Sequence, residues 1–255
     1  MEKILDRFLR YVAVDTQSDP TSETQPSATK ELDLLKILKD ELLAMGVEAT
    51  LDEYGYVMAT IPANCGKEIP AVGFIAHVDT APDASGAGIK PQIIPDYDGT
   101  DIPLKGVEGL SLKVSDFPEL LDYKGQTIIT TDGTTLLGAD DKAGIASIIE
   151  AYKAVKDMGL PIKDVYMYFT ANEEMGMYGA KLFDYSKLKC KEIISVDAAG
   201  DPGVIAAAGR GSNIIEITFK GKQAHIIRNP EEGVNALKMM AEAIANIPVG
   251  KFEDE

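Results

Sequence analysis

The 255-residue sequence has no tryptophan, only two cysteines and only two histidines. Two cysteines are too few for the disulfide framework of a small secreted protein. No stretch approaches the roughly 20 apolar residues of a membrane-spanning helix. Residues 1–18 carry scattered charges instead of the apolar centre of a signal peptide. We therefore expect a cytoplasmic protein with no membrane partner.

Positive charge is also scarce. Lys and Arg number 25 against 41 Asp and Glu, which gives a formal net charge of −16 at pH 7. Nucleic acids are bound by clustered Lys and Arg, so a nucleic-acid partner is not expected. The acidic excess fits solubility, and a sharper alternative is that some of the carboxylates hold cations.

Apolar periodicity predicts strands that alternate with helices up to about residue 208. This order predicts an α/β fold with a mostly parallel, twisted sheet flanked by helices. Gly, Pro and Asp are frequent in residues 82–126, which predicts a long loop-rich excursion. The expected helices are 2–13, a second one capped by Ser27 and ending near Gly46, 142–157 and 175–183; the expected strands are 48–53, 56–61, 71–76, 126–130, 164–170 and 192–196.

The pattern changes near Gly209. An alternating segment through Ile215, Ile217 and Phe219 predicts one strand, and residues 230–246 predict one helix. Two elements cannot bury a core by themselves. We expect one domain over residues 1–208, without its C-terminal part, and the incomplete beginning of a smaller α+β domain over 209–255.

His77 directly follows the buried strand at 71–76, in the segment FIAHVDT. Side chains at positions i and i+2 of extended chain point the same way. His77 and Asp79 can therefore face one site at the C-terminal end of the strand, where open α/β sheets bind their ligands. The alternative is an ordinary histidine at a strand end, with an Asp that caps the next turn.

Three further segments bring acids to strand ends or strand–helix junctions. Asp140 and Asp141 begin a helix in GADDKAG, Glu173 and Glu174 follow a strand in FTANEEMG, and Asp197 follows another in IISVDAAG. Each alone could be a helix cap or a solvated acidic turn. Together with the histidine, they predict a cluster at one edge of the sheet.

One histidine with several carboxylates suits Zn²⁺ and would also accept Mn²⁺ or Co²⁺. Two metal ions that share a bridging carboxylate can activate one water, while a free Glu accepts its proton. Other chemistries fit less well, because the sequence has no Ser nucleophile elbow, no P-loop and no dinucleotide fingerprint.

The sequence resembles the peptidase T family of tripeptide aminopeptidases in four segments, PAVGFIAHVDTAPDASG, GQTIITTDGTTLLGADDKAGIA, FTANEEMGMYGAK and SVDAAG. That family belongs to the larger di-zinc family of aminoacylases, carboxypeptidases and dipeptidases. The resemblance covers about residues 1–200 in order, including the excursion at 82–126. It implies a zinc-exopeptidase-like catalytic domain over 1–208 and the beginning of a lid or dimerisation domain over 209–255.

The resemblance implies a role for each residue of the cluster and a cis peptide bond between Asp140 and Asp141. His77 and Asp197 would be ligands of the first zinc, Asp140 the bridging carboxylate, Glu174 a ligand of the second zinc, Glu173 the general base, and Asp79 the acid that orients His77. Asp141 matches the family pattern but receives no ligand role.

His225, in KGKQAHIIRNPEEG, resembles a histidine that the family lends from its lid domain, often across a homodimer, to hold the substrate carbonyl. The alternative is a surface histidine on a turn. Family members continue for well over a hundred residues beyond position 255 and supply one more His ligand to the second zinc. We therefore expect an incomplete chain whose second zinc is bound weakly.

Two kinds of function remain open at this point. The first is an enzyme that hydrolyses the N-terminal peptide bond of tripeptides, or another family activity such as that of a dipeptidase, carboxypeptidase or deacylase. The second is a non-catalytic, metal-binding fragment.

Overall fold

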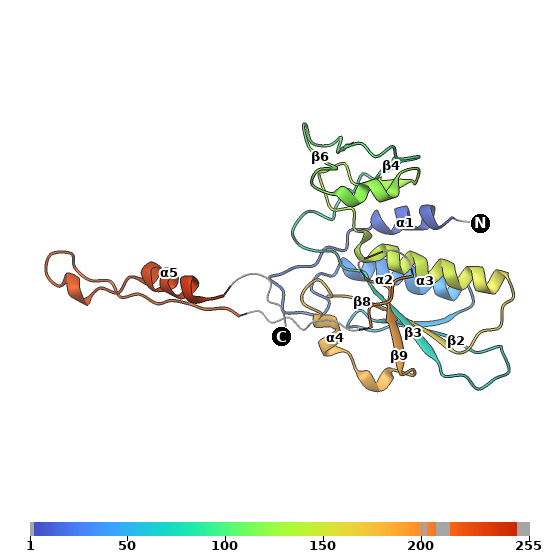
Figure 1. Cartoon of the computed structure of the whole chain (residues 1–255). Coiled ribbons are helices and arrows are strands. Elements are labelled where there is room, and N and C mark those ends of the chain that lie inside the picture. The colour runs from blue at the N-terminus through green and yellow to red at the C-terminus, as the bar shows by residue number, and fades with distance from the viewer. Residues whose placement is uncertain (1–2, 199, 201–202, 208–214, 249–255) are drawn as a thin grey trace. The chain divides into compact units, whose positions relative to one another are not determined.

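The computed structural model describes residues 3–198, 200, 203–207 and 215–248 (Figure 1). The chain divides into two compact units, Met1–Val204 and Ile205–Glu255. The predicted domain boundary at 208/209 lies outside the described residues. No helix of the described part has the length and apolar character that crossing a bilayer requires.

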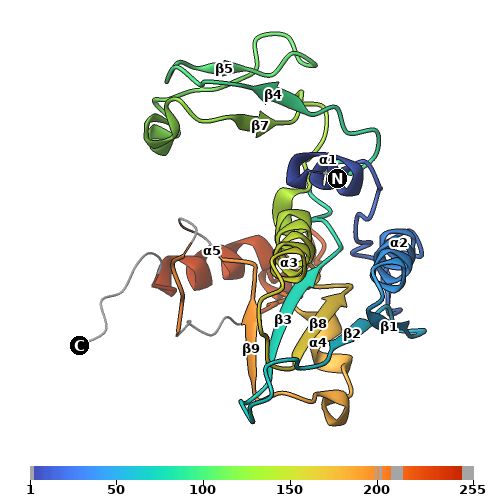
Figure 2. The same ribbon diagram turned by 90° about the vertical axis from the view of Figure 1, so that its right-hand side faces the viewer.

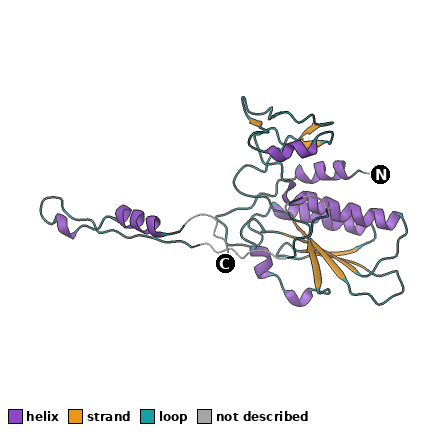
Figure 3. Ribbon diagram, in the orientation of Figure 1, coloured by secondary structure: helices purple, strands orange, loops and turns teal. Residues whose placement is uncertain are grey.

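The first unit is built on a five-stranded sheet with the order β1-β2-β8-β3-β9; its strands are orange in Figure 3. The pairs β3–β8 and β3–β9 are parallel, whereas β1–β2 and β2–β8 are antiparallel. The α/β class is confirmed, but the sheet is mixed instead of mostly parallel. Only residues 52–56 connect β1 to β2, and so short a connection permits a hairpin but no crossover. The strands are β1 (Glu48–Leu51), β2 (Val57–Ile61), β3 (Val72–His77), β8 (Val165–Thr170) and β9 (Glu192–Ser195).

Helices α2 (Glu31–Ala44) and α3 (Ala139–Asp157) pack against this sheet, and α1 (Ile4–Val12) packs against α3. Figure 2 shows α2 over β1 and β2, and α3 over β3, on the same side of the sheet. Burial of their apolar faces against the strands is the main stabilising contribution in this core. The core includes Leu34, Leu35, Leu38 and Leu42 of α2, Ile145 and Ile149 of α3, and Val57, Ala76, Met167 and Phe169 of the strands.

The sequence predicted that Ser27 caps α2, and this prediction is wrong. The helix begins at Glu31, and residues 28–30 form turns before it. The Ser27 hydroxyl instead donates a hydrogen bond of 2.7 Å to the Glu31 carboxylate, within the same buried region. A short hydroxyl side chain readily forms such local bonds in place of a cap.

The excursion at 82–126 contains more regular structure than a loop. β4 (Gln92–Ile94) pairs with β7 (Ile128–Thr130), and β5 (Ile102–Pro103) pairs with β6 (Ser111–Leu112). A 3₁₀ helix, η1, spans Pro118–Tyr123. The strand expected at 126–130 therefore exists as β7, but it belongs to a separate two-stranded sheet. Between β8 and β9 lie α4 (Tyr178–Leu182) and the 3₁₀ helix η2 (Tyr185–Lys187).

The second unit contains the 3₁₀ helix η3 (Pro230–Glu232) and helix α5 (Ala236–Asn246), with Asn235 as its N-cap. The helix expected from 230 thus begins six residues later, because extended backbone at Gly233 interrupts it. The strand expected through Ile215, Ile217 and Phe219 is wrong for the described residues 215–220, which form no strand. Ile215 is 80% exposed there, and a strand without a paired neighbour has little to stabilise it.

Candidate metal centre

The side chains predicted to cluster come together at one edge of the central sheet. His77 ends β3, Asp140 lies in the first turn of α3, and Asp197 follows β9. His77 Nε2 lies 2.9 Å from Asp140 Oδ1 and 3.6 Å from Asp197 Oδ2. It also lies 4.0 Å from Glu173 Oε2, in the turn after β8. Four segments far apart in the sequence therefore deliver their polar groups to one point.

Two overlapping groups at this edge could hold a metal ion: His77, Asp141 and Asp197, and His77, Asp140 and Glu174. Within each group, the ligand atoms all lie within 4.8 Å of one another. One imidazole nitrogen with carboxylate oxygens is a donor set that suits Zn²⁺ and related divalent ions. The residues present therefore fit the metal that the sequence predicted.

The imidazole of His77 is held in one orientation. Its Nδ1 lies 2.9 Å from the Asp79 backbone carbonyl and 3.3 Å from Asp79 Oδ1. With a proton on Nδ1 donated to this residue, the Nε2 lone pair faces the acids, as in a metal-ligating histidine. Burial lowers the pKa of His77, but the hydrogen bond and charge of Asp79 outweigh it and raise that pKa to about 10.

Asp79 is fully buried, and hydrogen bonds occupy its carboxylate. Its Oδ1 accepts from the Glu173 backbone N–H at 2.9 Å, and its Oδ2 accepts from the Glu174 N–H at 3.0 Å and the Ser18 hydroxyl at 2.8 Å. Burial opposes ionisation, but His77 and these donors hold the pKa of Asp79 below its usual value. Asp79 thus contacts both the histidine and the acidic turn, which is the placement that an orienting residue needs.

The acids around His77 are crowded. Burial, followed by the charges of neighbouring acids, raises the pKa of Asp141 to about 8, although the charge of His77 opposes the shift. Burial and neighbouring carboxylates also raise the pKa values of Glu173, Glu174 and Asp197. Like charges close together disfavour ionisation, and a cation between them reverses this effect. The electrostatics of the cluster therefore favour cation binding.

Asp141 is the residue of this site that the sequence did not single out as a ligand. It is 3% exposed; its Oδ2 accepts from the His77 N–H at 3.3 Å, and its Oδ1 accepts from the Gly144 N–H at 3.2 Å. The expected cis peptide bond between Asp140 and Asp141 is present. Nothing in the pattern GADDKAG distinguishes the two adjacent acids, so only the three-dimensional structure reveals that both face the cluster.

Gly144 shows why a residue without a side chain is needed next to Asp141. A Cβ at position 144 would lie 2.2 Å from Asp141 Oδ1 and 2.3 Å from the Val196 carbonyl oxygen, closer than atoms can approach. Glycine therefore allows α3 to lie directly against the segment that follows β9.

His225 belongs to the second unit, where it is exposed. Its Nδ1 accepts from the backbone N–H groups of Ile227 at 3.2 Å and Arg228 at 3.3 Å, which closes a local turn. Its predicted role toward a substrate stays a prediction.

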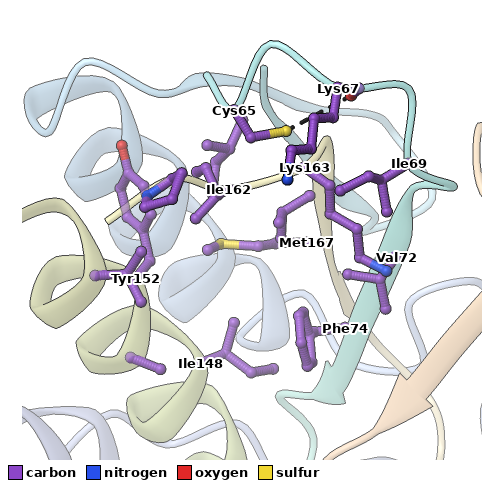
Figure 4. Close-up of a pocket in the computed structure, with 15 residues that line it drawn as sticks. Cys65, Lys67, Ile69, Val72, Phe74, Ile148, Tyr152, Ile162, Lys163 and Met167 are labelled. Atoms are coloured by element: carbon purple, nitrogen blue, oxygen red, sulfur yellow. Dashed lines mark hydrogen bonds between the residues drawn. The ribbon is translucent and has the colours of Figure 1, made fainter. Parts of the chain in front are cut away.

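Two cavities lie at different ends of the central strands. The smaller, of about 210 Å³, borders the cluster through His77, Glu173 and Asp197, and its remaining lining is mainly apolar and aromatic. The larger, of about 590 Å³, is lined by residues such as Phe74 and Tyr152 and contains none of the clustered acids (Figure 4). The clustered acids therefore border the smaller of these two cavities and not the larger one.

Comparison with known families gives two matches. Residues 121–220 match the M42 glutamyl aminopeptidase family, and residues 208–254 match the peptidase dimerisation domain. Among curated proteins, the chain is 45% identical over 251 residues to peptidase T of Geobacillus sp. (strain WCH70), covering 98% of this chain and 61% of that protein. It is 43% identical to peptidase T of Clostridium acetobutylicum, over 97% of this chain and 61% of that protein. The chain thus spans about 61% of the length of these relatives.

Solved structures agree with the sequence relatives. The aminopeptidase PepT of Bacillus cereus superposes with a TM-score of 0.65 at 28% identity, covering 99% of this chain and 58% of that one. A tripeptidase of Staphylococcus aureus shares the fold, with a TM-score of 0.64 at 24% identity over 97% of this chain and 56% of that one.

Proposed function

The chain is a homologue of peptidase T along nearly its whole length, and on this premise we propose that it is a metallo-aminopeptidase that removes the N-terminal residue of short peptides, tripeptides above all. One observation carries the proposal: a single buried histidine and acids from three other segments form two overlapping ligand groups at one sheet edge. Zinc is the metal that this donor set suits best.

The arrangement supports a different ligand role for each acid. His77 and Asp197 would hold the first ion, and Glu174 the second. Asp140 contacts His77 and shares a ligand group with Glu174, so it is well placed to bridge the two ions. Asp141, which shares a group with His77 and Asp197, would support the first ion. When bound, two ions would supply Lewis acidity that lowers the pKa of a shared water and polarises the peptide carbonyl.

Glu173 is the proposed general base. Its carboxylate lies 4.0 Å from His77 Nε2, outside both ligand groups, and burial raises its pKa above the usual value. A carboxylate with a raised pKa accepts a proton from water and then donates it to the leaving amine. Asp79, through its hydrogen bonds to the Glu173 N–H and to His77, would keep the positions of both residues fixed during these transfers.

The second unit supports an assembly role. Residues 208–254 match a peptidase dimerisation domain, and α5 carries large exposed apolar side chains, including Leu237 at 67% and Ile244 at 56%. Such side chains favour association. We propose a homodimer through this unit, with His225 contacting the substrate carbonyl, and a cytoplasmic location.

One observation favours a second candidate, a metal-binding domain without turnover. The two ligand groups share one histidine, so among the described residues the second ion would keep Glu174 and the Asp140 carboxylate that it shares with the first ion. Two carboxylates make an open site of low affinity for zinc.

A release assay separates the two functions. The protein is incubated with tripeptides of varied N-terminal residue, with zinc, without added metal and with chelator, and free amino acids are quantified. Turnover that the chelator abolishes supports the aminopeptidase. Zinc binding by calorimetry with no turnover supports the second candidate. The absence of both zinc binding and turnover would contradict both candidates.

A further inference from the structure

Two buried carboxylates hold the turn that carries Glu173 and Glu174. Three consecutive backbone N–H groups of this turn donate to them. The Glu173 and Glu174 N–H groups donate to Asp79, at 2.9 and 3.0 Å. The N–H of Asn172, one residue earlier, donates to Glu31 Oε2 at 3.2 Å, across 141 positions of sequence. Helix α2 therefore reaches the metal centre through its first residue.

Glu31 is the acceptor in each of three hydrogen bonds. It is fully buried. Its Oε1 accepts from the Ser27 hydroxyl at 2.7 Å and from the Ala28 N–H at 2.8 Å, while its Oε2 accepts from Asn172. Burying a carboxylate is unfavourable unless donors satisfy its oxygens, and here three donors converge on the two of them. A carboxylate is the side-chain group that can accept on both sides and donate on neither.

Asn172 is fixed by its side chain as well as its backbone. It is 1% exposed and adopts a left-handed φ of 60°, a conformation that Asn tolerates better than most residues. Its Oδ1 accepts from the Ser27 N–H at 3.0 Å, and its Nδ2 donates to Gln25 Oε1 at 2.6 Å. The residue before the proposed base is therefore held against the segment that leads into α2.

We propose that Glu31 is a positioning residue for the metal centre: by holding the Asn172 N–H, it fixes the turn so that the Glu173 and Glu174 carboxylates face His77 and Asp140. The inference rests on the proposed function for its catalytic consequence. Its structural part, the fixed turn, stands on the hydrogen bonds alone. Displacement of reacting groups by about 1 Å costs on the order of 10²-fold in rate, so a residue remote from the chemistry can govern it.

The test is the variant Glu31→Gln. Its amide keeps one acceptor oxygen and places two N–H donors where the carboxylate accepted, so it cannot satisfy both Asn172 and the Ser27–Ala28 side. We expect faster amide hydrogen exchange in the 170–175 peptide of the metal-free protein. Zinc affinity should fall by about 10–100-fold, the usual effect of losing a partner that orients ligands. If the protein turns over peptides, kcat should fall much more than KM changes.

Ser27→Ala is the matched control. It removes one donor to Oε1 but leaves the Asn172 N–H on Oε2 and the Ser27 N–H on Asn172 Oδ1. Exchange of the 170–175 peptide and zinc affinity should stay within about threefold of the unmodified protein, since Asn172 keeps its bond. If Glu31→Gln does not fold, Glu31→Asp keeps the charge on a shorter stem, and the same losses are expected from it.

The outcomes separate this inference from the proposed function. Unchanged exchange of the 170–175 peptide in a folded Glu31 variant would overturn the inference, whatever the metal does. Faster exchange with unchanged zinc affinity would also overturn it, because the turn would then not govern the centre. An unmodified protein that binds no zinc would contradict the proposed function, and the exchange experiment would still decide whether Glu31 fixes the turn.

Discussion

The two ends of the same strands differ sharply in chemistry. At their C-terminal ends, β3, β8 and β9 lead into His77, Glu173 and Asp197, which converge on one point. At their N-terminal ends, β3 and β8 contribute Val72 and Val165 to the apolar cavity of about 590 Å³ shown in Figure 4. Cavity size and chemical capacity are therefore separate properties here. The site is recognised by convergent titratable groups with shifted pKa values, not by volume.

The largest expected effect that distinguishes the two ends is on turnover. Glu173→Ala should lower kcat by about 10²–10⁴-fold, the usual loss when a general base is removed. Zinc content should hardly change, because Glu173 lies outside both ligand groups. Steady-state kinetics and elemental analysis of the same preparations check both parts. Activity retained in Glu173→Ala would exclude Glu173 as the base.

Metal binding should change only when residues at the C-terminal ends of the strands are substituted. His77 belongs to both ligand groups, so His77→Ala should abolish tight binding, whereas the unmodified chain should retain about one tightly held zinc after dialysis. Phe74→Ala, on the same strand but in the apolar cavity, is the matched control and should bind zinc normally. Elemental analysis after dialysis measures both. Two tightly held zinc ions in the unmodified chain would show that the second ion has a further ligand.

The free energy of unfolding should change when buried residues of the apolar cavity at the N-terminal strand ends are substituted. Met167 lines the large cavity and is 1% exposed, so Met167→Ala should lower the free energy of unfolding by about 2–5 kcal/mol. Ile69 lines the same cavity but is 45% exposed, so Ile69→Ala should cost less than about 1 kcal/mol. Urea denaturation provides these values. Zinc affinity should be unchanged in both variants, and a loss there would mean that the two ends are coupled.

A further expected effect is a pH dependence of the stability of the metal-free protein. The pKa of Asp141 is raised in the folded state from 3.8 to about 8, and that of His77 from 6.5 to about 10. A raised folded-state pKa contributes stability at low pH that is lost as the pH rises through the folded value. The stability of the metal-free protein should therefore fall between about pH 4 and 8 through Asp141, and between about pH 6.5 and 10 through His77.

Thermal unfolding in chelator across this pH range checks the sign. Asp141→Asn cannot ionise, so its stability should fall less steeply between about pH 4 and 8. Added zinc should reverse the trend, because it favours the ionised acids and neutral His77. A metal-free protein that becomes more stable as the pH rises would contradict these pKa directions.

Sequence periodicity located most elements of the first unit, because buried strands such as 71–76 and the apolar stripe of α2 leave a local pattern. It also indicated that His77 and the acids lie at strand ends. Pairing is a non-local property, so the sequence did not reveal that β7 leaves the central sheet or that β1 and β2 are antiparallel to their neighbours. The strand expected through Ile215 and Ile217 shows the same limit, since alternation alone supplies no partner.

Two residues of the site could not be predicted from the sequence for a similar reason. Asp141 directly follows Asp140 in the sequence, and its burial against His77 depends on how α3 packs on β3. Glu31 lies in an unremarkable helix start, and its contact with Asn172 spans most of the first unit. Local patterns identify residues that end strands, but they do not identify groups that reach a site through a distant backbone bond.

The single histidine common to both ligand groups would link the binding of two ions thermodynamically. If two ions bind as proposed, the ion that takes the His77 imidazole would withdraw a ligand from the other group, so each ion would lower the affinity of the protein for the next. Such negative cooperativity is reciprocal: the coupling free energy is the same whichever ion binds first. A zinc titration should therefore show two separated phases, and the protein should change between its singly and doubly loaded states over the range of free zinc that lies between them.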